Sequence, residues 1–219
     1  MDEARSNSIL NHLKEAGIIA ILRGQNPERM IQRGMDLANM GCTAIEVTLD
    51  SSNPLDIVRA LRQQLPASVM IGVGTLLNTE QVTPSVNAGA EFALSPGNPE
   101  GVIQHSHAAG LLFVPGVSNP TELEVAVTGG VHIAKLFPST EWTPEQLASV
   151  SLPWMPVGGV DAQSVWQWLD NGAWCVGMGA NLCGSDLSDE GNESSTWPES
   201  EEQTARGMFK ELQRRRNDA

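Results

Sequence analysis

The residue of this sequence best placed to do chemistry is Lys135, which lies inside the short apolar run 133–138 (IAKLFP). The run predicts a buried strand that ends at its proline. A lysine in such a strand loses the hydration of its charge, and this desolvation lowers its pKa. The neutral amine can then attack a carbonyl carbon and form a Schiff base. The structural alternative is a side chain that reaches the rim of its strand and keeps its ammonium in water.

Glu46 is a second ionisable residue inside a predicted strand, in the run 44–49 (AIEVTL). A buried carboxylate is also costly alone, so a buried glutamate and a buried lysine in one fold are expected to pair. One interpretation is a structural ion pair. The other is a lysine that captures a carbonyl while the carboxylate moves protons. Perturbed pairs of this kind concentrate at functional sites, which favours the second interpretation.

Strand-like and helix-like segments alternate along the chain and predict how these residues are positioned. Short, nearly continuous apolar runs are typical of parallel strands covered on both faces. They occupy residues 18–22, 44–49, 69–76, 92–95, 111–117, 133–137, 155–160 and 175–180. A capping residue followed by proline marks predicted helix starts at residues 26–27, 53–54, 98–99, 119–120 and 143–144. This alternation predicts an α/β fold, a (β/α)8 TIM barrel, with an open doubly wound sheet as the alternative.

Each end of the chain adds a helix to the predicted barrel. Residues 6–16 have an amphipathic pattern, and residues 204–216 predict a final helix. Residues 184–202, rich in glycine, serine and acids, predict an exposed, mobile loop. The basic triplet 214–216 is interpreted as a solvated helix end rather than a nucleic-acid patch. Residues 1–219 are predicted to form one barrel domain.

The composition argues against several classes of function. The formal net charge is −13, whereas a nucleic-acid-binding protein needs a basic surface. No apolar run reaches the ~18 residues of a membrane span, and the N-terminus lacks the apolar core of a secretory signal. The three cysteines form no CxxC pair and the four histidines show no ligand spacing. We therefore expect a cytoplasmic protein without a metal or other cofactor.

The carboxyl ends of the predicted strands are where a barrel of this type collects its functional residues. Arg23 ends the first strand and can bind a carboxylate or phosphate, or form a salt bridge at the rim. Thr75 ends the third, where its hydroxyl can contact a ligand or simply occupy a strand position. Gly158, Gly159, Gly177 and Gly179 lie at the seventh and eighth strands, where such barrels bind phosphate, although glycines also serve close packing.

In these segments the chain resembles the 2-keto-3-deoxy-6-phosphogluconate aldolase family, which includes the 4-hydroxy-2-oxoglutarate and 2-keto-3-deoxy-6-phosphogalactonate aldolases. The resemblance covers roughly residues 16–183. It rests on motifs that occur in order: AILRG (20–24), IEVTL (45–49), GVGTLL (72–77), ALSPG (93–97), VPGVSNPTE (114–122), KLFPS (135–139) and PVGGV (156–160).

The resemblance implies a class I aldolase that works without a metal. Such an enzyme cleaves a 2-keto-3-deoxy sugar acid or a 4-hydroxy-2-oxo acid reversibly to pyruvate and an aldehyde. It implies that Lys135 forms the Schiff base and that Glu46 moves protons. The implied substrate-binding residues are Thr75 and the backbone near Pro96 for the pyruvate carboxylate, Phe137 for the pyruvyl group, and Arg23, Gly158, Gly159 and Gly179 for a distal phosphate. The family is typically homotrimeric, which implies a homotrimer.

Two positions depart from the family pattern and bear on the substrate. Asp50 stands where the phosphogluconate enzymes often have an arginine, and Ala180 where the family often has a phosphate-binding serine. A hydrogen bond to a charged group contributes about 1.5–3 kcal/mol, so both changes are expected to weaken phosphate binding. An unphosphorylated keto-deoxy acid is therefore a candidate substrate. A phosphate-binding isomerase or epimerase, and a non-catalytic binding barrel, are the alternative functions.

Overall fold

The apolar runs of the sequence are parallel strands in the computed structural model, which describes residues 1–147, 150–188 and 196–218. Their bounds are β1 (Ile18–Leu22), β2 (Ala44–Thr48), β3 (Met70–Gly74), β4 (Phe92–Leu94), β5 (Leu112–Val114), β6 (Gly116–Val117), β7 (Ala134–Leu136), β8 (Trp154–Pro156) and β9 (Val176–Met178). Hydrogen bonds join them in the orders β5-β4-β3-β2-β1-β9 and β6-β7-β8.

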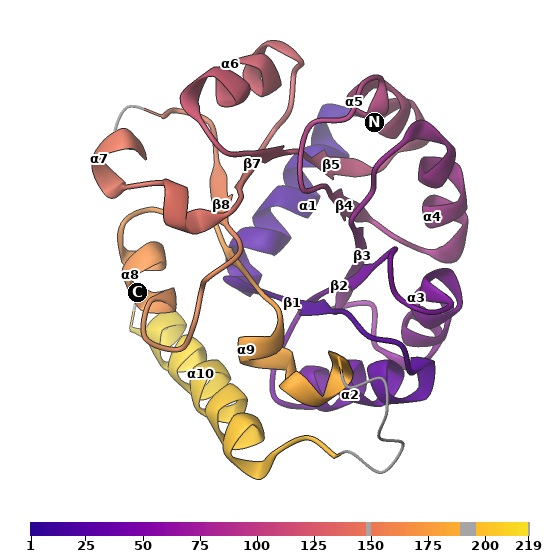
Figure 1. Cartoon of the computed structure of the whole chain (residues 1–219), viewed down its shortest axis with the longest axis vertical. Helices are drawn as coiled ribbons and strands as arrows, with labels where there is room; N and C mark the ends of the chain where they lie inside the picture. Colours follow the sequence, from indigo (N-terminus) through magenta and orange to yellow (C-terminus); the bar gives the residue numbers. More distant parts are fainter. Residues whose placement is uncertain (148–149, 189–195, 219) are drawn as a thin grey trace.

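The two sets of strands close into one ring (Figure 1). β5 and β6 are halves of one barrel strand on either side of Pro115, which has no N–H to donate to a neighbour. A bridge between Val157 and Gly177 joins β8 to β9, and β9 pairs with β1. The closed ring confirms the predicted (β/α)8 barrel and excludes the open doubly wound sheet.

The helices lie around the outside of this ring, with α1 as the exception (Figure 1). They are α1 (Glu3–Ala16), α2 (Pro27–Asn39), α3 (Pro54–Gln64), α4 (Val82–Ala88), α5 (Val102–Ala109), α6 (Pro120–Thr128), α7 (Pro144–Leu147), α8 (Val165–Asp170), α9 (Ala180–Cys183) and α10 (Glu199–Asn217). The 3-10 turns are η1 (Thr79–Gln81), η2 (Ser139–Glu141) and η3 (Ser185–Ser188). Within the described ranges, none of the helices is long and apolar enough to cross a membrane.

Most of the predicted helix starts are confirmed. The side chains of Asn26 and Asn119 accept backbone N–H groups in the first turns of α2 and α6, as N-caps do. The start predicted at residues 98–99 is wrong, because α5 begins at Val102. Gly101 has a φ of +74°, a left-handed conformation that interrupts a right-handed helical path between Pro99 and Val102.

The residues of a strand belong alternately to two buried clusters, because the strand is pleated. On β1, Ile19 and Ile21 belong to a cluster inside the ring, whereas Ile18, Ala20 and Leu22 belong to a cluster between strands and helices. Successive side chains of a strand point to opposite faces, so both faces of the ring are covered. This double burial explains why the strands are nearly continuous apolar runs.

The N-terminal helix α1 closes one end of the ring. Its buried residues Ile9, Leu10 and Leu13 belong to the cluster inside the ring, and the indole N–H of Trp174 donates to the carbonyl of Leu10 at 2.9 Å. In Figure 1 this helix crosses the ring behind the strands. It therefore blocks the end opposite the carboxyl ends of the strands, and the lumen can open only at those carboxyl ends.

The segment after β9 is more ordered, in its described parts, than the predicted exposed loop 184–202. Asp186 is buried and its carboxylate accepts two hydrogen bonds from Arg33 of α2, at 2.9 and 3.0 Å. The Arg33 guanidinium lies over the ring of Trp197, 3.9 Å from its centroid. Helix α10 begins at Glu199, earlier than the predicted start at residue 204. The sequence pattern could not predict the burial of Asp186, because its partner Arg33 lies far away in the chain. Residues 189–195 lie outside the described ranges.

Replacing Asp186 with asparagine is expected to lower the free energy of unfolding by about 3–5 kcal/mol, because it leaves the buried Arg33 without its counter-charge. Denaturation in urea measures the change. Asp218→Asn is the matched control, since Asp218 pairs with Arg214 where both side chains are more than half exposed. Such a surface pair contributes about 0–1 kcal/mol. Equal losses in the two variants would contradict the prediction.

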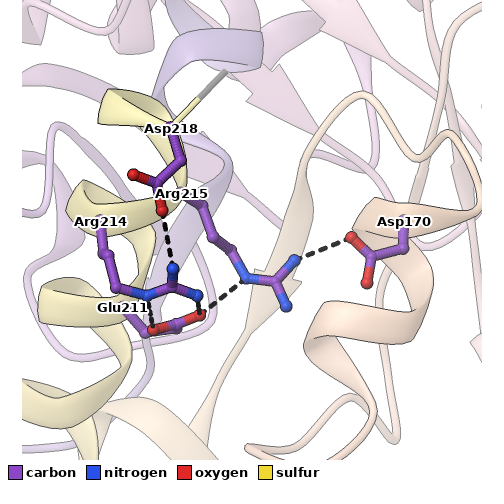
Figure 2. A network of polar contacts seen from close by, with 5 residues as sticks. All are labelled: Asp170, Glu211, Arg214, Arg215 and Asp218. Atoms are coloured by element: carbon purple, nitrogen blue, oxygen red, sulfur yellow. Dashed lines mark hydrogen bonds and ion pairs between the residues drawn. The ribbon is translucent and has the colours of Figure 1, made fainter.

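The basic triplet at the end of α10 is engaged with neighbouring acids and backbone. Figure 2 shows Arg214 bonded to Glu211 and Asp218, and Arg215 bonded to Glu211 and Asp170. The third member of the triplet donates to the backbone at the end of α1. These contacts fit the predicted helix end, because they occupy the charges that a nucleic-acid surface would present to phosphates.

Candidate active site

Lys135 on β7 and Glu46 on β2 both face the inside of the ring. Ile133 and Ala44, each two residues earlier on the same strand, belong to the cluster inside the ring, and the pleat places alternate residues on one face. Lys135 is 6% exposed and Glu46 is 2% exposed. This burial excludes the interpretation in which the Lys135 side chain reaches solvent at the rim of its strand.

Glycines on β3 make the room that Glu46 occupies. A Cβ on Gly74 would lie 1.5 Å from Glu46 Oε1, so no larger residue at this position is compatible with the observed carboxylate. A Cβ on Gly72 would lie 2.4 Å from the ring of Phe92. The GVG sequence of β3 therefore lets one ring and one carboxylate share the interior of a narrow barrel.

Burial shifts both pKa values toward the neutral forms. It raises the pKa of Glu46, against the opposing effects of the positive charges of Lys135 and Arg23. It lowers the pKa of Lys135, against the opposing effect of Glu46. Within the described part of the chain neither group has a hydrogen bond or ion pair, and Glu46 Oε2 is buried without a partner. The structural ion pair is thus not formed directly, and neither side chain is held by a hydrogen bond from the described residues.

Phe137 lies beside the lysine on the same face of the strand. Lys135 Nζ lies 4.5 Å from the centroid of the Phe137 ring, a cation–π distance. Gly158, in the loop after β8, has a φ of +81°, and a Cβ there would lie 3.0 Å from this ring. The left-handed glycine therefore lets the β8 loop pass close to the ring that contacts the lysine.

Arg23, after β1, connects two other predicted positions at the mouth of the ring. Its Nη1 forms an ion pair with Asp50 after β2, and its Nη2 donates to Thr75 Oγ1 at 3.2 Å. Thr75 has a φ of +57°, an outlying conformation for a β-branched residue. Such strain concentrates at functional sites, where the surrounding structure holds it in place. This feature cannot be read from the residue types.

The remaining predicted residues lie farther around the rim. Pro96 follows β4, and its carbonyl oxygen would lie 2.2 Å from a Cβ on Gly116, so glycine permits this close approach. A Cβ on Gly159 would likewise lie 3.1 Å from Thr140 of η2. Gly179 and Ala180 begin α9.

Ser139 and Asn181 position these loops and were missed from the sequence. Ser139 Oγ donates to the carbonyl of Gly158 at 2.5 Å, which ties the β7 loop to the β8 loop. The side-chain amide of Asn181 donates to the carbonyl of Val160 at 3.0 Å, which ties α9 to the same loop. Their partners are backbone carbonyls of distant loops, and nothing in the residue types or spacing indicates such partners.

Comparison with known proteins identifies relatives across most of the chain. Residues 9–196 match the family model described as KDPG and KHG aldolase. The chain is 32% identical over 174 residues to a probable 2-dehydro-3-deoxy-6-phosphogalactonate aldolase of Rhizobium meliloti, an alignment that covers 77% of this chain and 82% of that protein. It is 27% identical over 170 residues to a 2-dehydro-3-deoxy-phosphogluconate aldolase of Haemophilus influenzae, covering 75% and 80%.

Solved structures give the same relationship at the level of the fold. The structure described as native KDPGal superposes with a TM-score of 0.76 at 25% identity, covering 92% of this chain and 96% of the other. A KDPG aldolase of Legionella pneumophila, with pyruvate captured as a covalent carbinolamine, superposes with a TM-score of 0.75 at 22% identity, covering 93% and 95%.

Proposed function

Because this chain belongs to the KDPG and KHG aldolase family, we propose that Lys135 and Glu46 are its catalytic residues. The chain is a class I aldolase, a lyase that cleaves keto-deoxy sugar acids to pyruvate and an aldehyde. The observation that carries the assignment is the pair of buried ionisable side chains on the lumen faces of β2 and β7. Each lacks a hydrogen-bond partner within the described residues, and burial makes the lysine amine less basic.

The chemistry follows from these two groups. The neutral Nζ of Lys135 attacks the C2 carbonyl of the substrate, and loss of water with uptake of one proton from solvent leaves an iminium ion. Glu46 accepts the proton of the C4 hydroxyl while the C3–C4 bond breaks, and the electron pair of that bond passes into the iminium to form an enamine. The aldehyde leaves, Glu46 returns a proton to C3, and water hydrolyses the imine to release pyruvate.

The other residues of the mouth are assigned to substrate binding. The Thr75 hydroxyl and the backbone near Pro96 hold the pyruvate carboxylate, and Phe137 packs on the pyruvyl group beside Lys135. Arg23 and the loops of Gly158, Gly159, Gly179 and Ala180 face the distal end of the substrate. Support comes from the placement of all these positions at the carboxyl ends of the strands, where barrel enzymes bind their ligands.

Borohydride trapping tests the assignment of Lys135. After incubation of the native protein with pyruvate and sodium borohydride, a pyruvyl adduct is expected on Lys135, found by mass spectrometry of peptides. Lys14 and Lys210 are internal controls in the same spectrum, because they are the other lysines of the chain. Lys14 lies over the ring of Trp174 at the closed end of the barrel. An adduct on these residues alone, or no adduct on folded protein, would refute the assignment.

We also propose a homotrimer in the cytoplasm, built from one barrel domain per chain. The trimer rests on the resemblance to the family, and the cytoplasmic setting on three cysteines that are all buried and unpaired. Light scattering coupled to size-exclusion chromatography measures the number of chains directly. A monomeric mass at working concentrations would refute the trimer and would leave the proposed catalytic roles of Lys135 and Glu46 unaffected.

A further inference from the structure

Arg23 at the barrel mouth is already engaged by groups of the protein itself. Its guanidinium forms an ion pair with Asp50 and donates to Thr75. The side chains of Arg23 and Asp50 are 55% and 42% exposed, and the two residues follow β1 and β2 at the carboxyl ends of the strands. Within the described residues, the cations whose charges act on Glu46 are Lys135 and Arg23. Arg23 is therefore a cation that the distal end of a substrate can meet at the barrel mouth.

Asp50 makes this cation a poor partner for a second anion. Carboxylate and phosphate oxygens bind the same N–H groups of a guanidinium, so a distal phosphate competes with Asp50 for Arg23. The phosphate then carries its two negative charges beside the Asp50 carboxylate, and like charges in contact disfavour binding. A sugar hydroxyl meets no such repulsion. It can donate a hydrogen bond to the Asp50 carboxylate, and a bond to an ionised acceptor is a strong one.

A cavity beside Gly159 is polar but uncharged. This cavity of about 300 Å³ lies between η2 and α8, and its lining includes Thr140, Gly159, Gln167 and Asn171. Hydroxyl, amide and indole groups line it, and the described residues around it include no charged side chain. A Cβ on Gly159 would lie 3.1 Å from Thr140, and a Cβ on Gly158 would lie 3.0 Å from the Phe137 ring that lies against Lys135, so the loop after β8 borders both the cavity and that ring. Groups of this kind suit the hydroxyls of a polyol better than a dianion.

We propose that Asp50 is a specificity-determining residue that selects an unphosphorylated substrate, a 2-keto-3-deoxy sugar acid whose cleavage releases a neutral polyhydroxy aldehyde. The proposal rests on the aldolase function proposed above. Asp50 acts in two ways: it holds Arg23 in an ion pair with which a distal phosphate would compete, and it accepts hydrogen bonds from distal hydroxyls.

The test compares two aldehydes that differ only in a phosphate group. In the condensation direction, kcat/KM is measured for glyceraldehyde and for glyceraldehyde 3-phosphate at saturating pyruvate. The native enzyme is expected to prefer the neutral aldehyde by about tenfold or more, and Asp50→Asn to shift the ratio toward the phosphorylated one by about tenfold. Asp50→Glu, which keeps the charge, is expected to keep the native preference. Inorganic phosphate is expected to inhibit Asp50→Asn more strongly than the native enzyme.

Asp56→Asn is the matched control, because it removes the same charge from an exposed pair with Arg59 on α3, outside the barrel mouth. A native enzyme that prefers the phosphorylated aldehyde, or that leaves glyceraldehyde unreacted, overturns the proposal. The proposal is also overturned if the ratio of kcat/KM for the two aldehydes changes no more in Asp50→Asn than in Asp56→Asn. Borohydride trapping in the same preparations separates a failure of the Asp50 proposal from a failure of the proposed catalytic function. An intact Lys135 adduct with the wrong preference removes only the role of Asp50, whereas loss of the adduct removes the proposed catalytic function.

Discussion

Alanine in place of Lys135 is expected to lower kcat for aldol cleavage by about 10⁴-fold or more, as loss of a covalent nucleophile does in other enzymes. Without the amine there is no iminium to accept the electrons of the breaking carbon–carbon bond. Pyruvate release in a coupled assay measures the rate, and borohydride trapping is expected to give no adduct. The protein is expected to remain folded, because the change removes a buried ionisable group rather than part of the apolar core.

Arginine at position 135 separates covalent from electrostatic catalysis. Lys135→Arg keeps a cation on β7 but offers no amine for imine formation, so it is expected to be as inactive as the alanine variant. Activity retained by the arginine variant would assign an electrostatic role to the side chain. Lys14→Ala is the matched control, since it removes a lysine that stacks on Trp174 far from the barrel mouth. Turnover of Lys135→Ala near the native rate would end the Schiff-base assignment.

Glutamine in place of Glu46 is expected to lower kcat by about 10²–10⁴-fold, the usual range for loss of a general acid–base group. Exchange of the pyruvate methyl protons with deuterated water, followed by NMR, is expected to slow by a similar factor. Trapping of pyruvate on Lys135 is expected to persist, because imine formation depends first on the amine. Glu91→Gln, which alters a half-buried pair with Arg62 outside the site, is the control. Native exchange rates in Glu46→Gln would exclude this residue from proton transfer.

The pH dependence carries a second signature of Glu46. Burial raises the pKa of its carboxyl above the ordinary value of 4.5, and the group must be ionised to accept the C4 hydroxyl proton. Activity is therefore expected to fall on the acid side through a pKa above 4.5, and Glu46→Gln is expected to lose this limb. The raised pKa of Glu46 also affects stability. Because the pKa is higher in the folded than in the unfolded state, ionising Glu46 lowers the free energy of unfolding as the pH rises from the unfolded-state pKa toward the folded-state pKa. Glu46→Gln is thus expected to be more stable than the native protein at neutral pH, measured by urea denaturation.

The segments of the barrel could be predicted from the sequence because their signals are local. A strand covered on both faces needs an apolar run, and the positions of β1 and β2 follow from that pattern. The caps at Asn26 and Asn119 depend on residues within one turn. The predicted start of α5 was wrong because Gly101 adopts a left-handed conformation, and the residue types around it do not show that a glycine will use this freedom.

The chemical types in the site were also visible in the sequence. A lysine and a glutamate inside apolar strands are unusual wherever they occur, so Lys135 and Glu46 stand out without any knowledge of their surroundings. The sequence by itself therefore determined which strands form, which two side chains are costly to bury and, through the ordered motifs, which family the chain resembles.

Only the tertiary structure decided which distant groups meet. Parallel pairing of β1 with β2 and of β2 with β3 brings the loops after these strands together, and this proximity creates the contacts of Arg23 with Asp50 and Thr75. The same long-range packing buries Asp186 against Arg33 in a stretch that its composition marks as exposed. The physical reason is that burial, ion pairing and backbone strain depend on neighbours far apart in the chain, whereas strand and helix signals depend on neighbours within a few residues.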